Sequence, residues 1–131
     1  MASIQKSVEV EVGAAQAWAA LRLVGNPHKL FAPVLVDAQL DGDTRTAHFA
    51  NGMIVHERML DIDEATRRVA YTALDGPGMS YHHASMQIVE AGPGRCRFVW
   101  ITDFLPADVG AAITPLIEQG TKALKANLER S

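Results

Sequence analysis

The strongest constraint on the fold is a run of six short segments of strand character within residues 34–105. Apolar and polar residues alternate in these segments, and turn signals separate them, such as Asp-Gly-Asp at 41–43, Asn-Gly at 51–52 and Gly-Pro-Gly at 92–94. Turns this short join neighbouring strands in antiparallel order. A further strand of about eight residues is expected within 3–12, so the pattern predicts seven strands.

Two short helical segments are expected directly after the first strand. Apolar residues recur at helical spacing in "AAQAWAALRL", residues 14–23, which predicts a short amphipathic helix. The next stretch, "VGNPHKLFAP", contains Pro27 and Pro33 and predicts a loop or a single helical turn.

The end of the chain changes to the periodicity of a long amphipathic helix. From Pro106 onward the apolar residues follow one helical stripe. We interpret Thr114 as an N-cap and Pro115 as the first helical position, because proline lacks only an amide that would be unpaired there. The prediction is a short helical turn at 107–112, a kink, and a long helix over 115–130.

These elements predict an α+β protein in which one helix must cover the dry face of a curved antiparallel sheet. The chain has 131 residues, of which 48% are hydrophobic, and this fits a single domain over 1–131. A bent sheet wrapped round one helix commonly leaves a gap between the two layers. We therefore expect a cavity of the kind that binds a small molecule.

Composition excludes several functional classes. The formal net charge is −3 and the basic residues are scattered, so no nucleic-acid partner is expected. No apolar run approaches the ~20 residues that span a bilayer, and the N-terminus lacks the apolar segment of a signal peptide. We expect a soluble, cytoplasmic protein without membrane insertion, as a monomer or homodimer. The single cysteine, Cys96, is expected to be a buried apolar residue.

One predicted strand, "NGMIVHERML" at 51–60, carries three consecutive ionisable residues. Neighbouring side chains on a strand point to opposite faces, so Glu57 cannot share a face with His56 and Arg58. Whichever face is buried therefore takes an ionisable group inside. Periodicity alone leaves the choice of face open.

Several strings, in their order and spacing, resemble the START/Bet v 1-like helix-grip superfamily. The similarity is to its small bacterial polyketide cyclase/dehydrase and lipid-transport members, and it covers nearly the whole chain. It is carried by "VEVGAAQAWAAL", "GNPHKLFAPV", "NGMIVHERMLDID", "RRVAYTAL" and "RCRFVWITDFLP". Phe31 departs from the pattern, because many members have tryptophan there. The positions that match the superfamily are Trp18, Gly52, Glu57, Arg58, Asp63, Tyr71 and Trp100.

The resemblance implies that Glu57 lines the cavity and that His56 and Arg58 point outward. Strand alternation then places His82 inside and His83 outside, while the face of Tyr71 stays open. The Gly-Pro-Gly at 76–78 is implied to gate the cavity mouth. The expected ligand-binding residues are Phe31, Phe49, Val55, Glu57, Met59, Tyr71, His82, Ala84, Met86, Trp100, Thr102, Ile113 and Ile117.

Glu57 and His82 are the candidate catalytic residues. Desolvation in an apolar cavity would raise the pKa of Glu57 and suit it to general acid or base chemistry. Alternatively, Glu57 is hydrogen-bonded to pocket water or to a neighbour such as Tyr71 or His82, and it shapes the polarity of the cavity or anchors a ligand without catalysis. The adjacent His82 and His83 cannot share one ion, since alternation sends them to opposite faces. No metal or cofactor is therefore expected.

The ligand is expected to be neutral or phenolic and largely apolar, such as a polyketide, an isoprenoid or a lipid fragment. In the related plant hormone receptors a cavity lysine binds the ligand's carboxylate, and Phe31 takes that place here, which would leave Glu57 without a balancing cation. Three functions stay open: a binding protein for such a molecule, a cofactor-independent cyclase, dehydratase or isomerase, and an accessory interaction protein with an incidental cavity.

Overall fold

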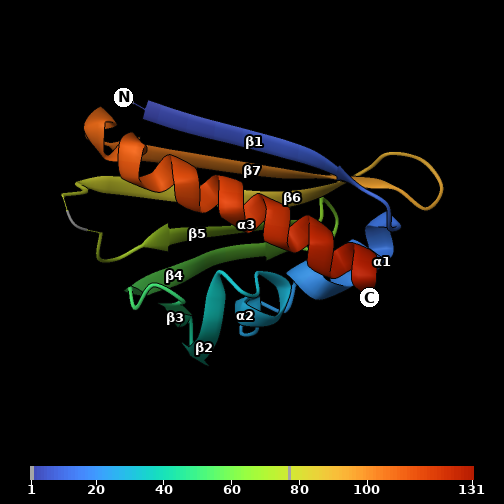
Figure 1. The fold of residues 1–131 in the computed structure, drawn as a ribbon, viewed down its shortest axis with the longest axis horizontal. Coiled ribbons are helices and arrows are strands. Elements are labelled where there is room, and N and C mark those ends of the chain that lie inside the picture. The colour runs from blue at the N-terminus through green and yellow to red at the C-terminus, as the bar shows by residue number, and fades with distance from the viewer. Residues whose placement is uncertain (1, 77) are drawn as a thin grey trace.

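The computed structural model describes residues 2–76 and 78–131 and contains one seven-stranded antiparallel sheet (Figure 1). Each expected strand is present, and two short helices follow the first one, so the predicted helix-grip architecture is confirmed. The elements in chain order are β1 (Ala2–Val10), α1 (Ala14–Leu21), α2 (Pro27–Leu30), β2 (Leu35–Asp41), β3 (Thr44–Phe49), β4 (Ile54–Asp63), β5 (Arg68–Ala73), β6 (Tyr81–Glu90), β7 (Cys96–Leu105), a 3-10 turn (Ala107–Val109) and α3 (Gly110–Arg130).

The strands from β2 to β7 lie in chain order, each beside the next, as short turns require. β1 pairs antiparallel with β7, from Ala2 opposite Phe104 to Val10 opposite Cys96. This pairing brings the start of the chain next to its last strand. The two edges of the sheet are therefore β1 and β2, and α3 runs diagonally across one face (Figure 1).

The expected kink before Pro115 is wrong, because α3 is continuous from Gly110 and contains this proline. Thr114 does not cap a helix from outside, and its hydroxyl instead donates to the Gly110 carbonyl at 2.8 Å. Pro115 leaves the carbonyl of Ala111 without its helical donor. Pro115 and Ala111 are both exposed, so water can satisfy this carbonyl and the helix tolerates the proline.

Among the described residues, no helix combines the length and apolarity needed to cross a bilayer.

The hydrophobic core occupies one end of the space between the sheet and α3. The C-terminal half of α3 contributes Leu124 and Leu128, which pack with Trp18 from α1 and with Phe98 from β7. Cys96 is fully buried here, as expected, and burial raises the pKa of its thiol. The N-terminal half of α3 lies over the other end of the sheet, where side chains leave the space unfilled.

Candidate functional site

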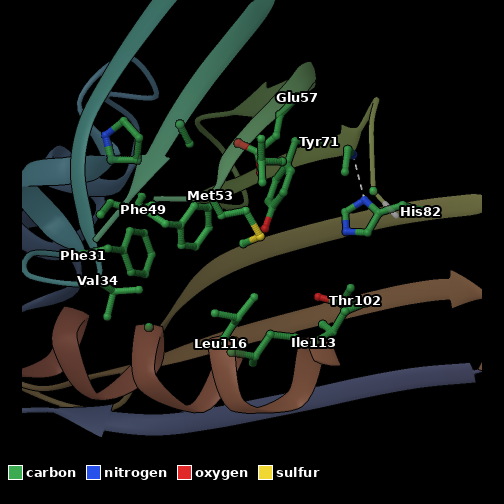
Figure 2. A pocket seen from close by; sticks show the side chains of 18 of the residues that line it. Phe31, Val34, Phe49, Met53, Glu57, Tyr71, His82, Thr102, Ile113 and Leu116 are labelled. Atoms are coloured by element: carbon green, nitrogen blue, oxygen red, sulfur yellow. Dashed lines mark hydrogen bonds between the residues drawn. The ribbon is translucent and has the colours of Figure 1, made fainter. Parts of the chain in front are cut away.

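A cavity of about 680 Å³ lies between the N-terminal half of α3 and the sheet (Figure 2). Its size falls in the range of small-molecule binding pockets. Most of its wall is apolar, and a few polar side chains reach it from β3, β4, β5 and β6. The predicted site residues on this wall are Phe31, Phe49, Val55, Glu57, Tyr71, His82, Met86, Trp100, Thr102, Ile113 and Ile117. Their role in binding a ligand stays a prediction.

Two predicted site residues, Met59 and Ala84, do not reach the cavity. Met59 lies opposite Tyr71 beside an irregularity in the pairing of β4 with β5, and it lines only a small void of about 20 Å³ under α1 and α2. Ala84 is fully buried between Tyr71 and Thr102, its partners on the neighbouring strands. Its methyl group is too short to reach past these longer side chains.

Aromatic side chains form part of the cavity wall. The ring centroids of Phe31 and Trp100 are 5.7 Å apart, and Phe49 also lines the cavity. Gly120 of α3 lies against Trp100, and a Cβ atom there would come within 2.9 Å of the indole ring. The missing side chain therefore allows the indole to lie close beneath the helix.

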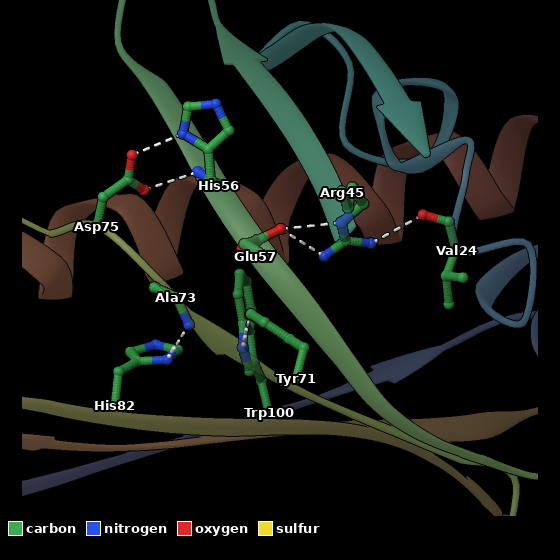
Figure 3. Close-up of polar contacts among 9 residues, drawn as sticks. All are labelled: Val24, Arg45, His56, Glu57, Tyr71, Ala73, Asp75, His82 and Trp100. Atoms are coloured by element: carbon green, nitrogen blue, oxygen red, sulfur yellow. Dashed lines mark hydrogen bonds and ion pairs between the residues drawn. The ribbon is translucent and has the colours of Figure 1, made fainter. Parts of the chain in front are cut away.

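The principal polar feature is an ion pair between Arg45 of β3 and Glu57 of β4 (Figure 3). These residues face each other directly across the two strands. Nε and Nη2 of Arg45 each lie 2.8 Å from Oε1 of Glu57, and Nη1 donates to the Val24 carbonyl at 3.1 Å. The two side chains are 10% and 13% exposed, so the pair is largely removed from solvent.

Arg45 corrects two expectations about Glu57. The carboxylate was expected to lack a balancing cation, and its alternative hydrogen-bond partners were pocket water or a neighbour such as Tyr71 or His82, but the structure pairs it with Arg45. The guanidinium of Arg45 supplies the balancing charge that was missing from the expectation for Glu57. The sequence did contain a signal, because Arg45 shares its strand parity with Phe49, which was expected to line the cavity.

Tyr71 lies beneath the ion pair and joins it to the aromatic wall. The guanidinium carbon of Arg45 is 5.4 Å from the centroid of the Tyr71 ring, within reach of a cation–π interaction. The hydroxyl of Tyr71 accepts a hydrogen bond from Nε1 of Trp100 at 3.2 Å. Burial, reinforced by the nearby Glu57 carboxylate, raises the pKa of Tyr71 far above its ordinary value, so this side chain stays neutral.

His82 lies at the other side of Tyr71, with ring centroids 5.9 Å apart. The backbone amide of Ala73 donates to its Nδ1 at 2.9 Å (Figure 3). Burial lowers the pKa of His82, and the neighbouring charge of His83 lowers it further. Both effects favour the neutral imidazole.

A second pair of ionisable side chains, His56 and Asp75, lies at the rim of the cavity. The side chain of His56 is exposed, and its Nδ1 lies 2.6 Å from Oδ2 of Asp75, a residue that lines the cavity. Hydrogen bonds from His56 lower the pKa of Asp75.

Arg58 is also exposed and lies 4.0 Å from Asp43. The 76–78 segment expected to act as a gate includes Pro77, which lies outside the described residues, while Gly76 and Met79 line the cavity.

Metal-ligating side chains do not converge here in the described ranges 2–76 and 78–131, where no three His, Cys, Asp or Glu residues form a cluster.

A curved antiparallel sheet closed round one long helix, with a cavity between them, is the architecture of the START/Bet v 1-like superfamily. The chain belongs to the polyketide cyclase/dehydrase and lipid transport family, whose sequence profile matches residues 1–129. A search of the curated proteins found no match.

Solved structures share this fold along nearly the whole chain. A solution structure from Thermobifida fusca is 26% identical, with a TM-score of 0.83 over 99% of this chain and 95% of that one. Norcoclaurine synthase from Thalictrum flavum, in complex with dopamine and hydroxybenzaldehyde, is 18% identical, with a TM-score of 0.76 over 98% of this chain and 84% of that one. The di-domain ARO/CYC protein BexL of the BE-7585A biosynthetic pathway is 14% identical, with a TM-score of 0.84 over 98% of this chain and 47% of that one.

Proposed function

We propose that this protein binds a small, largely apolar molecule in the cavity between α3 and the sheet. The observation that carries the proposal is an unfilled volume of about 680 Å³ with a mainly apolar wall and a few polar groups. Burial of apolar surface supplies affinity, and a small number of fixed polar groups supplies orientation. An incidental cavity in an interaction protein is less well supported, because side chains leave so much of this interior unfilled.

The charge of the wall supports a neutral ligand. Arg45 and Glu57 cancel each other's formal charge, and Tyr71 and His82 are both neutral near pH 7. Among the described residues, the remaining ionisable group on the wall is the Asp75 carboxylate at the rim, which lies 2.6 Å from Nδ1 of the exposed His56. An anionic ligand would therefore lose its hydration without meeting an uncompensated cation. The solved complex of norcoclaurine synthase, with dopamine and hydroxybenzaldehyde, shows that a related fold accommodates small aromatic molecules.

A second candidate is a cofactor-independent cyclase, dehydratase or isomerase acting on a polyketide-like substrate. The observation that favours it is the Glu57 carboxylate on the cavity wall, of which only Oε1 is held by Arg45. A proton could be taken up at Oε2. His82 is a weaker candidate for the base, because the lone pair on its Nδ1 already accepts the Ala73 amide.

Binding is tested by native mass spectrometry of the purified protein and by titration with the neutral apolar dye Nile red. The double variant Val55→Trp/Ile113→Trp places two large rings in the cavity and is expected to reduce dye affinity at least about tenfold. The matched control Val89→Trp/Ala111→Trp adds the same rings at exposed positions outside the cavity wall and is expected to bind normally. Equal loss in both variants, or dye binding unaffected by either, would contradict binding in this cavity.

Catalysis is tested separately with Glu57→Gln on any polyketide-like substrate that the protein converts. Lost turnover with retained binding would support the enzyme, because the amide cannot take up the proton. Unchanged turnover would exclude Glu57 as the acid or base.

A further inference from the structure

Glu57 lines the cavity, and one oxygen of its carboxylate has no hydrogen-bond partner among the described residues. Both donors that it receives from Arg45 reach Oε1, and Oε2 forms no hydrogen bond with any described residue. Arg45 is itself tied to the Val24 carbonyl, so the carboxylate is held at a fixed position. A carboxylate oxygen can only accept a hydrogen bond. Glu57 therefore offers a fixed acceptor for a hydroxyl group.

The imidazole of His82 presents the opposite function. The Ala73 amide can only donate, so Nδ1 of His82 must carry the lone pair. In the neutral ring the proton is then assigned to Nε2. Burial lowers the pKa of His82, which supports this neutral form at pH 7. Nε2 has no partner in the described part of the chain, and the side chain lines the cavity, so His82 offers a donor for a carbonyl group.

The acceptor and the donor lie on either side of Tyr71. The Tyr71 ring centroid is 5.4 Å from the guanidinium carbon of Arg45, which holds Glu57, and 5.9 Å from the imidazole centroid of His82. One small molecule lying along this ring can therefore reach both groups. Figure 2 shows Glu57 and His82 flanking Tyr71 on the same wall.

We propose that the cavity selects uncharged, largely apolar molecules that carry both a hydroxyl group, which donates to Oε2 of Glu57, and a carbonyl group, which accepts from Nε2 of His82. This inference rests on the proposed binding function and specifies its ligand class. A carboxylate ligand would meet the free oxygen of Glu57, where like charges repel. An ammonium ligand could donate to Oε2 of Glu57, but the guanidinium of Arg45 already balances the charge of that carboxylate, and the N–H of His82 offers it no acceptor.

The test uses a series of diaryl compounds of one size, titrated by calorimetry against the wild-type protein. The meta and para isomers of hydroxybenzophenone carry both the hydroxyl and the carbonyl group. Benzophenone carries only the carbonyl group, and para-benzylphenol carries only the hydroxyl group. The acid in the series, para-benzoylbenzoic acid, adds a carboxylate to the carbonyl group. The tighter hydroxybenzophenone isomer is expected to bind about tenfold more tightly than either single-group compound. The acid is expected to bind most weakly.

A variant of His82 assigns the carbonyl group to its partner. His82→Phe is expected to reduce the affinity of hydroxybenzophenone to that of para-benzylphenol and to leave para-benzylphenol unchanged. The matched control, His83→Phe, alters a residue outside the cavity wall and is expected to change neither. Should His82→Phe fail to fold, the wild-type series alone still decides the proposal.

The outcomes separate this inference from the function beneath it. Equal affinity across the uncharged compounds would overturn the inference and leave the proposed binding function standing. Tightest binding of the acid would likewise overturn the preference for uncharged ligands. Failure of every compound to bind, together with loss of the Nile red signal, would overturn both.

Discussion

Removal of Arg45 should destabilise the protein strongly, whereas removal of Arg45 and Glu57 together should not. Arg45→Met leaves Glu57 as an unpaired carboxylate with a side chain only 13% exposed. Loss of one partner from a buried ion pair typically costs ~3–5 kcal/mol of unfolding free energy. Glu57 lines the cavity, so water can solvate its carboxylate in part and the cost should lie near ~3 kcal/mol. The Val24 carbonyl also loses its donor, which adds about 1 kcal/mol.

The double variant Arg45→Met/Glu57→Leu removes both charges and keeps apolar bulk at both positions. Replacement of a buried ion pair by apolar residues is often neutral or stabilising. We expect its unfolding free energy to lie within about 1 kcal/mol of wild type. The two single substitutions should therefore be non-additive by at least about 2 kcal/mol.

Urea unfolding followed by circular dichroism measures these differences, provided that the m-value is unchanged. Arg58→Met serves as the control, since Arg58 is 53% exposed and its contact with Asp43 is 4.0 Å long. Its effect should stay within about 0.5 kcal/mol. A cost below about 1 kcal/mol for Arg45→Met, or additive single variants, would refute the view that this pair is desolvated and coupled.

Two further predictions concern the aromatic wall and its hydroxyl. Gly120→Ala improves helix propensity by about 1 kcal/mol, but its Cβ would lie 2.9 Å from the Trp100 ring, so we expect net destabilisation and a shifted tryptophan emission. The control Ala126→Gly, at an exposed position of α3, measures the propensity effect alone. A stabilised protein with unchanged emission would contradict the close packing of Gly120 against Trp100. In a Tyr81→Phe background Tyr71 is the single tyrosine. Because burial raises the pKa of Tyr71 in the folded protein, the free energy of unfolding should fall as the pH rises above ~10. Phenolate absorbance should appear only as the circular dichroism signal is lost, and phenolate in a folded protein would contradict this prediction.

The sequence predicted the strands and the layer arrangement because alternation and turn chemistry are local. It also placed Glu57 and His82 on the cavity wall, although the face of β4 was decided by resemblance rather than by periodicity. Arg45 was missed even though its parity was available, since its pairing with Glu57 depends on the register between β3 and β4. Register follows from the geometry of the turn and cannot be read from side-chain type alone.

Other features depended on contacts between distant parts of the chain. The position of Met59 follows from the irregular pairing between Met59 and Asp61, which no turn signal announces. The beginning of α3 was misplaced because a threonine–proline pair resembles a helix start, whereas solvent beside Ala111 lets the helix continue through Pro115. The hydrogen bond from the Ala73 amide to His82 joins a backbone group to a side chain on the next strand, and no residue pattern specifies it.

The pairing of β1 with β7 affects how this chain can fold. Ala2 lies opposite Phe104, so the first strand gains its partner in the sheet only after most of the chain has been made. The helix that covers the sheet, α3, follows later still. Until then the apolar face of the sheet stays uncovered, and closing so long a loop carries a large entropic cost. We therefore expect this domain to complete its fold only once α3 is available, and a chain that lacks α3 would expose the apolar face of the sheet to aggregation.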